Sequence, residues 1–299
     1  MKIMTRNYLI RVLTMAIYLI TACNTASGIE NNIHDKNSEA EKNVRIDMNS
    51  EELDWIEFAY SSDVEEGYDI YLCIGQSNMA GRGYLLDSDK NEVVEGVYLL
   101  DNEGKPVPAT HPFNQYSTIR KNMDMQQMSL CYSFSKKMRE AYPERPILLV
   151  CNARGGTSIT QWMNDSEEEY YKEAVDRCTE ALKYGSLKGI LWHQGCSDSK
   201  KLVDEYMSYL KDLVKGLRKD LKAQDAPFVA GELPYWRTSS EDFNMMINEI
   251  SEKIPYTSCV SAEGLGMRND EDDPHFSRDA LITLGERYAD ALIKLISKE

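Results

Sequence analysis

Short runs of apolar, β-prone residues recur along the chain, separated by longer segments in which apolar positions follow a helical period. The strand-like runs cover residues 70–74, 97–100, 147–151, 189–192, 228–230 and 258–261. Because these runs are apolar at nearly every position rather than at alternate ones, they predict strands that are covered on both sides of a sheet.

The intervening segments have the spacing of amphipathic helices and cover residues 126–142, 166–184, 200–222 and 239–253. Ser166 and Glu169 have the spacing of a capping box, which predicts the start of the second of these helices. A last helix is predicted at the carboxyl terminus, where Ser277 is a suitable N-cap. Its apolar stripe consists of Leu281, Leu284, Tyr288, Leu292 and Ile296.

This alternation of strands and helices predicts one α/β domain over residues 68–299, a three-layer α/β/α sandwich of flavodoxin-like type with a mainly parallel sheet. In open sheets of this kind, ligands bind beyond the carboxyl ends of the strands. Residues that directly follow the predicted strands are therefore the first candidates for a functional site.

The first 22 residues have the pattern of a bacterial lipoprotein signal peptide. Three basic residues precede an apolar run over 12–22 that is too short to span a bilayer, and this run ends in small residues directly before Cys23. We predict that Cys23 carries a lipid that binds the protein to a membrane, so that the mature protein is an outer-membrane or cell-surface lipoprotein. A plain signal peptide with another cleavage site is the alternative, and it also places the protein outside the cytoplasm.

The segment that follows, residues 23–67, is rich in Asn, Glu, Asp, Ser and Lys, which predicts an acidic, solvated tether. The 299 residues include 34 basic and 49 acidic ones, giving a formal net charge of −15. After the first 23 residues, 31 basic residues remain against the same 49 acidic ones. Such a surface repels phosphate backbones, and no basic stripe offsets it, so we expect no nucleic-acid partner.

The first predicted strand ends in the sequence GQSNMAG at residues 75–81. A serine between glycines at a strand end can sit on a tight turn with its hydroxyl exposed, which makes Ser77 a candidate nucleophile. The alternative is a turn in which Ser77 caps a helix. The nucleophile elbow G-x-S-x-G of α/β-hydrolases is not matched, because Met79 occupies the position of its second glycine.

Two further strand ends carry polar groups. The run at 147–151 leads into NARGGTS, where Gly155 and Gly156 allow close backbone approach to an anion or oxyanion, or form only a turn. The run at 189–192 leads into HQGCSD, where His193 and Gln194 can reach across the end of the sheet. Gln194 is a candidate donor to developing negative charge; a buried histidine and a loop brace are the structural alternatives.

The chain has four histidines, and His275 is the one that directly precedes the terminal helix within an acidic segment. Asp272 lies three residues before it, a spacing at which a carboxylate can meet the imidazole and hold its tautomer. Solvated acids at the start of a helix are the alternative. The segment lacks the glycine and the spacing of a calcium loop, and the chain has no C-x-x-C pair, so we predict no metal site.

The ordered motifs GQSNMAG, ARGGTSI, WHQG-x-SD and D-x-x-HF together resemble the SGNH or GDSL-like hydrolases, in the branch of sialate O-acetylesterases and acetylxylan esterases of carbohydrate esterase family six. The resemblance implies that Ser77 is the nucleophile, His275 the base and Asp272 the orienting acid. It also implies an oxyanion hole formed by the Ser77 N–H, an N–H of Gly155 or Gly156, and the Gln194 amide.

The activity that this resemblance implies is hydrolysis of O-acetyl esters of a carbohydrate such as acetylxylan or sialic acid, without a cofactor. Among residues that contact the sugar we expect Gln76, Asn78, His193 and Trp236. A sugar O-acetyltransferase with the same three side chains is one alternative. A glycan-binding lipoprotein without activity is another.

Two departures from the family pattern stand out. Cys196 occupies the position of the glutamate in the usual HQGE motif, and we expect this change to alter specificity or lower activity. The loop before the second helix contains Gln127, Met128 and Ser129 in place of a Gly-Pro-Gly-like stretch, which affects the expected shape of the pocket but not the three reacting side chains.

Overall fold

The computed structural model describes residues 67–269 and 273–297. The predicted signal peptide and nearly all of the predicted tether, with Cys23, lie outside these residues, as does Asp272. Within them, no helix is both long and apolar enough to cross a membrane.

The sheet has seven strands in the order β3-β2-β4-β1-β5-β6-β7, and every neighbouring pair is parallel except β2 and β3. The strands are β1 (Tyr68–Gly75), β2 (Val93–Leu100), β3 (Pro106–Thr110), β4 (Ile147–Ala153), β5 (Gly185–His193), β6 (Phe228–Gly231) and β7 (Thr257–Val260). This architecture confirms the predicted α/β fold with a mainly parallel sheet.

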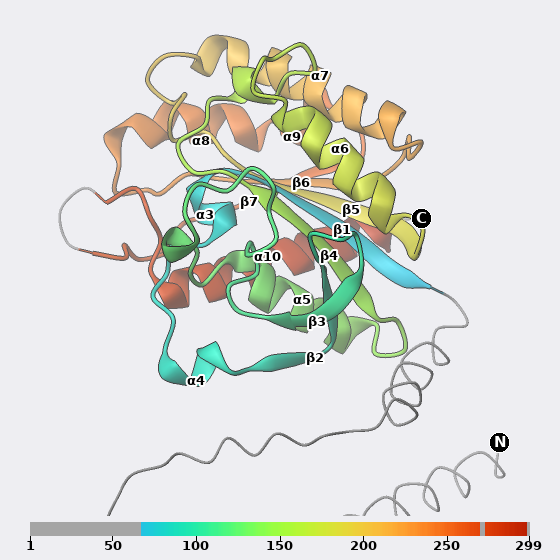
Figure 1. Ribbon diagram of the computed structural model, residues 1–299. Helices are drawn as coiled ribbons and strands as arrows, with labels where there is room; N and C mark the ends of the chain where they lie inside the picture. Colours follow the sequence, from blue (N-terminus) through green and yellow to red (C-terminus); the bar gives the residue numbers. More distant parts are fainter. Residues whose placement is uncertain (1–66, 270–272, 298–299) are drawn as a thin grey trace, which may run out of the picture. The chain divides into compact units, whose positions relative to one another are not determined.

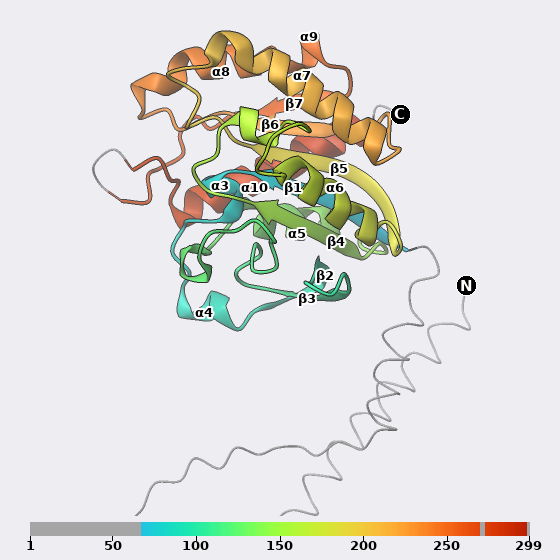
Figure 2. The ribbon, with the colours of Figure 1, turned by 45° about the horizontal axis from the view of Figure 1, so that its top comes forward.

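Helices cover both faces of the sheet (Figures 1 and 2). One face packs against α6 (Tyr170–Ala181), α7 (Val203–Asp220), α8 (Glu241–Asn248) and α9 (Ile250–Lys253), and the other against α5 (Leu130–Ala141) and α10 (Arg278–Ile296). Short helices α3 (Ser77–Ala80) and α4 (Asp87–Lys90) follow β1, and 3-10 turns occupy Met123–Met125, Ile159–Trp162 and Thr238–Ser240.

The central strand β1 shows why the sequences of the predicted strands are apolar at nearly every position. Ile70, Leu72 and Ile74 belong to the core on the α6–α7 side, whereas Tyr71 and Cys73 belong to the core on the α5–α10 side. All five side chains are almost completely buried, because each face of the strand meets a helical layer.

Strand β1 also lies at the point where the chain reverses its direction across the sheet. Strands β2 and β4 lie on one side of β1, and β5, β6 and β7 lie on the other. The loops that leave the carboxyl ends of β1 and its two neighbours therefore diverge at this edge, which is where open α/β sheets bind ligands.

Some local predictions are wrong, and each has a physical reason. Strand β3 was not predicted because Pro106 and Pro108 interrupt it, and the structure accommodates them on an antiparallel edge strand. The expected capping box is absent: α6 begins at Tyr170, Glu169 has a left-handed φ of 56°, and the Ser166 hydroxyl donates to Glu168 instead.

The terminal helix matches its prediction closely. Ser277 is the N-cap of α10, and its hydroxyl accepts a hydrogen bond from the Ala280 N–H. Most of the predicted stripe is buried against the sheet and α5, whereas Ile296 is only partly buried. The capped start of α10 is relevant to the functional site, because His275 lies two residues before the N-cap Ser277.

Candidate active site

Ser77 lies two residues beyond the last residue of β1, at the first position of the short helix α3. The loop that follows β4 comes close to it: a Cβ built on Gly155 would lie 3.3 Å from the Ser77 Cβ. N–H groups in the first turn of a helix have no acceptor within that helix, so the Ser77 N–H is directed away from the helix, as an oxyanion donor requires. The backbone conformation therefore presents both a hydroxyl and an N–H at the carboxyl edge of the sheet.

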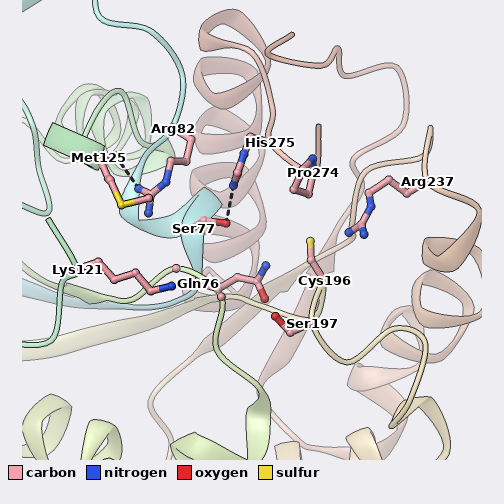
Figure 3. Close-up of a pocket in the computed structure, with 12 residues that line it drawn as sticks. Gln76, Ser77, Arg82, Lys121, Met125, Cys196, Ser197, Arg237, Pro274 and His275 are labelled. Carbon is pink, nitrogen blue, oxygen red and sulfur yellow. Dashed lines mark hydrogen bonds between the residues drawn. The ribbon is translucent and has the colours of Figure 1, made fainter. Parts of the chain in front are cut away.

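His275 contacts Ser77 directly, although 198 residues separate them in sequence (Figure 3). The His275 Nε2 lies 3.0 Å from the Ser77 Oγ, and its Nδ1 lies 2.6 Å from a carboxylate oxygen of Asp273. An ionised carboxylate can only accept, so the Nδ1 carries the proton and the Nε2 is free to accept the serine proton.

The acid of this hydrogen-bonded chain is Asp273, not the predicted Asp272. Asp273 lies two residues before His275, so one carboxylate oxygen accepts from both the backbone N–H (3.0 Å) and the Nδ1 of His275, in the manner of an Asx-turn. The D-x-x-H spacing in the sequence indicates the preceding residue, Asp272, instead. The sequence signal that could have found Asp273 is the Asp-Pro-His step itself, because it allows this turn.

Asp273 is held in place from its other oxygen as well. That oxygen accepts from the Arg268 Nε and Nη2 at 2.9 and 2.8 Å and from the Asn269 amide at 3.0 Å. Although burial raises the pKa of Asp273, its hydrogen bonds with Arg268 and the adjacent His275 hold that pKa below its ordinary value. Asp273 therefore remains charged beside the imidazole.

The pKa of His275 is lowered from its ordinary value, first because burial disfavours the imidazolium. Asp273 acts in the opposite direction, whereas Arg268 and Arg82 lower the pKa further by their positive charges. The imidazole is therefore neutral, and able to accept a proton, at neutral pH.

Asn78 positions the base and does not face a ligand. Its side chain is fully buried, donates to the Pro274 carbonyl at 3.1 Å and accepts from the Phe276 N–H at 3.2 Å. It thus holds the backbone on either side of His275. The expectation that Asn78 contacts substrate is wrong, because both ends of its amide are used within the protein.

Gln194 is likewise not an oxyanion donor. Its amide nitrogen donates to the Thr157 carbonyl at 2.7 Å and to Asp198 at 2.6 Å, and its oxygen accepts from the Tyr206 hydroxyl at 2.7 Å. Asp198 also accepts from the Ser158 hydroxyl and the Ile159 N–H. The pair therefore braces the loops after β4 and β5 against each other, which was the structural alternative.

His193 and Trp236 lie outside the cavity around Ser77. His193 is fully buried, its Nδ1 pairs with the Tyr288 hydroxyl at 3.0 Å, and burial lowers its pKa to about 4. Trp236 donates to the Asp273 carbonyl at 2.9 Å and packs against Phe276. The prediction for His193 is corrected, because it belongs to the core. Trp236 supports the loop that carries Asp273, but it is only partly buried and lines a neighbouring cavity together with Arg237, so its contact with a sugar stays a prediction.

The remaining predicted residues do meet at one cavity of about 310 Å³. It is lined by Gln76, Ser77, Arg82, Lys121, Met125, Gly155, Gly156, Cys196, Ser197, Arg237, Pro274 and His275. Gln76 also accepts from the Gly195 N–H at 3.1 Å, which fixes the loop that carries Cys196. The basic lining residues were not predicted, because nothing in their local sequence indicates that they converge.

One cluster in the described residues has the composition of a metal site, and it lies in the core away from this cavity. The sulfur atoms of Cys73, Cys131 and Cys151 all lie within 4.8 Å of one another, and the Met79 sulfur lies 3.6 Å from that of Cys131. Such sulfur atoms could hold a soft cation. Burial raises the pKa of Cys73, whereas hydrogen bonds with Cys151 and Cys73 lower the pKa of Cys131, so the three thiols do not share the thiolate form that a metal requires. All six cysteines in the described part of the chain are free.

The sequence of this chain is similar to those of known carbohydrate esterases. A profile of the family described as "Carbohydrate esterase, sialic acid-specific acetylesterase" matches residues 67–294. A probable carbohydrate esterase from Arabidopsis thaliana is 27% identical over 241 residues, which cover 75% of this chain and 90% of that protein.

Solved structures share the fold. A protein from Arabidopsis thaliana superposes with a TM-score of 0.68 at 24% identity, covering 76% of this chain and 98% of that one. NanS superposes with a TM-score of 0.61 at 20% identity, covering 78% and 99% of the respective chains. A carbohydrate acetylesterase from Xanthomonas citri has a TM-score of 0.57 at 16% identity, but the match covers only 57% of its chain.

The charges around His275 lead to a prediction that needs no substrate. Arg268→Gln removes a positive charge that lowers the imidazole pKa, so the His275 pKa is expected to rise, whereas Arg268→Lys should change it less. Titration of the His275 ring followed by NMR measures both values. A pKa that is equal in wild type and Arg268→Gln would contradict the electrostatic role given to Arg268.

Proposed function

Because this chain belongs to the family of carbohydrate esterases described as sialic acid-specific acetylesterases, and is by that membership a carbohydrate O-acetylesterase, we propose that Ser77, His275 and Asp273 perform its reaction. The single observation that carries the proposal is the continuous hydrogen-bonded chain from the Ser77 hydroxyl through His275 to Asp273. Its substrate is an O-acetyl ester of a carbohydrate.

In the first half of the reaction, the Ser77 Oγ passes its proton to the His275 Nε2 and bonds to the acetyl carbonyl carbon. Asp273 stabilises the imidazolium that forms. His275 then returns the proton to the sugar oxygen as the ester bond breaks, which leaves an acetyl group on Ser77. In the second half, His275 takes a proton from water, the resulting hydroxide attacks the acetyl group, and acetate leaves as Ser77 regains its proton.

Negative charge on the carbonyl oxygen is stabilised by backbone donors. We assign this role to the N–H groups of Ser77 and Gly155, because the loop after β4 brings Gly155 against the serine. Gly156 lies farther out: it has a left-handed φ of 76°, and a Cβ at this position would meet only Lys121. Arg82 is buried beside Gly155 and adds positive charge near the same oxygen.

The replacement at Cys196 leaves these reacting groups intact. Cys196 lines the cavity, but no described hydrogen bond of His275 or Asp273 depends on it. A binding protein with a decayed site would not need to keep a nucleophile, a base and an acid in mutual contact. This observation favours an active enzyme over a binder.

Ser77→Ala removes the nucleophile and should lower acetate release from a chromogenic acetate by about 10⁶-fold. Labelling with a fluorophosphonate should also disappear, since it requires a reactive serine. Thermal unfolding serves as the folding control. Wild-type rates of acetate release by folded Ser77→Ala protein would refute the proposal. With the wild-type enzyme, transfer of the acetyl group to an added sugar in competition with water would identify a transferase instead.

Asp273→Asn should lower kcat by about 10⁴-fold, because the amide no longer fixes the imidazole tautomer. Asp272→Asn is the matched control, with the same chemical change one residue earlier, and it should retain most of the activity. If instead Asp272→Asn were the inactive variant, the acid would be the residue that the D-x-x-H spacing indicates.

We also propose, from the sequence of residues 1–23, that the enzyme is tethered to a membrane through a lipid on Cys23. Wild-type protein produced in a bacterium with lipoprotein-processing enzymes should partition into the detergent phase and incorporate labelled fatty acid. Cys23→Ala should lose both properties. Labelling of the Cys23→Ala variant at the wild-type level would contradict lipidation at this residue.

A further inference from the structure

A second cavity adjoins the one that contains Ser77. It has a volume of about 390 Å³, and its walls come from the loop that follows β6, the 3-10 turn Thr238–Ser240 and the helix α8. Arg237, which extends toward the first cavity in Figure 3, lines both cavities. A ligand that is longer than the first cavity can therefore continue into the second.

One face of α8 forms a wall of this second cavity. The residues that line the cavity from this helix recur with helical spacing and so share one face: Glu241, Asn244, Met245 and Asn248. Asn244 ties the helix to the loop after β6, because its amide accepts from the Leu233 N–H at 2.8 Å and donates to the Leu233 carbonyl at 3.0 Å. These two bonds hold the two walls of the cavity at a fixed separation.

Tyr235 presents an aromatic ring at the second cavity. The residue is 52% exposed, but its hydroxyl is anchored, because it donates to the Glu232 carboxylate at 3.1 Å. The same carboxylate oxygen accepts from the Asn248 amide at 2.6 Å, and the other oxygen accepts from the Ser261 hydroxyl and the Ala262 N–H, both at 2.8 Å. A ring that is exposed and already held in place loses little freedom when a ligand packs on it.

Trp236 connects the second cavity with the reacting groups. It is only partly buried and lines this cavity, and its indole N–H donates to the Asp273 carbonyl at 2.9 Å. Its ring packs edge-on against Phe276, with the ring centroids 5.4 Å apart. A ligand in the second cavity therefore lies against the side chain that supports the loop carrying Asp273 and His275.

The charge of the second cavity differs from that of the first. The first is lined by three basic residues and, in its described lining, by no acidic one, whereas Glu241 offsets Arg237 in the second. The Thr238 hydroxyl and the Glu241 carboxylate have no hydrogen-bond partner within the described part of the chain. The second cavity therefore combines an apolar ring face, free hydrogen-bonding groups and balanced charge, a composition that suits a neutral ring bearing hydroxyls.

We propose that the second cavity binds a neutral sugar unit that is linked to the acetylated one. The ring of this unit packs on Tyr235, and its hydroxyls bond to the Thr238 hydroxyl and donate to the Glu241 carboxylate. The inference rests on the proposed function, since it places the acetyl group at Ser77 while the neighbouring unit occupies the second cavity. The enzyme then prefers an acetylated oligosaccharide to the same acetylated sugar alone, and Tyr235 and Glu241 are specificity-determining residues.

Substrate pairs that differ only in the neighbouring sugars test this inference. One pair is an O-acetylated xylose and a xylotriose with the same acetylated terminal unit. The other is an O-acetylated sialic acid, either free or as the terminal unit of sialyllactose. The readout is the ratio of kcat/KM for the longer substrate to that for the shorter one, in the pair that the enzyme hydrolyses faster. We expect this ratio to be about 10 or more in the wild-type enzyme, from one stacked ring and one or two hydrogen bonds.

Tyr235→Ala removes the ring and should lower this ratio by about 10-fold, because the added sugar loses the face on which it packs. Tyr256→Ala is the matched control. Tyr256 is 47% exposed, but it directly precedes β7 and so lies at the amino ends of the parallel strands, at the edge of the sheet opposite to both cavities. This control should leave the ratio unchanged, and thermal unfolding shows whether each variant is folded.

Glu241→Ala tests the polar side of the second cavity without changing the ring. Loss of the carboxylate should lower the ratio by about 3- to 10-fold, the usual effect of losing one hydrogen bond. Glu252→Ala is the control for this change, since it removes a carboxylate from the exposed surface of α9 and should leave the ratio unchanged.

The outcomes separate this inference from the proposed function. A ratio that falls in Tyr235→Ala and Glu241→Ala, but not in the two controls, supports the second sugar site. If Ser77→Ala abolishes activity while the ratio is near one in the wild-type enzyme, or is the same in wild type, Tyr235→Ala and Glu241→Ala, the second sugar site is refuted and the esterase stands. If Ser77→Ala remains active, the proposed function itself fails.

Discussion

The site depends on one carboxylate that is held from both of its oxygens. Asp273 accepts two hydrogen bonds from His275 and three from Arg268 and Asn269, and its own carbonyl accepts from Trp236. Such a group cannot rotate without losing several charge-assisted bonds. It therefore fixes the tautomer and direction of the imidazole, and through it the geometry of Ser77.

The loops around this chain are positioned by buried polar side chains that do not react. Asn78 joins the turn after β1 to the backbone on both sides of His275, and Gln194 with Asp198 joins the loops after β4 and β5. Each of these groups is buried and fully or largely hydrogen-bonded, so its removal would leave unsatisfied partners in the interior. Polar residues of the motifs thus divide into a few that react and several that hold loops.

Burial and nearby charges prepare His275 for its proposed role as a base. Burial first, and then the positive charges of Arg268 and Arg82, lower the pKa of His275, which keeps the imidazole neutral at neutral pH and suits a general base. Arg82, Lys121 and Arg237 line the cavity that contains this imidazole, and none of its described lining residues is acidic.

The sequence by itself determined the layers of the fold, because apolar runs and helical periods report burial directly, and it identified Ser77 and His275 through the strand-end motif and the position before α10. It pointed to Asp272 rather than Asp273, and it counted Asn78, His193 and Gln194 among residues that touch the ligand. These assignments failed because side-chain direction at a loop depends on which hydrogen-bond partners other loops supply. Only the tertiary structure, which brings segments nearly 200 residues apart into contact, decided which polar groups face the cavity.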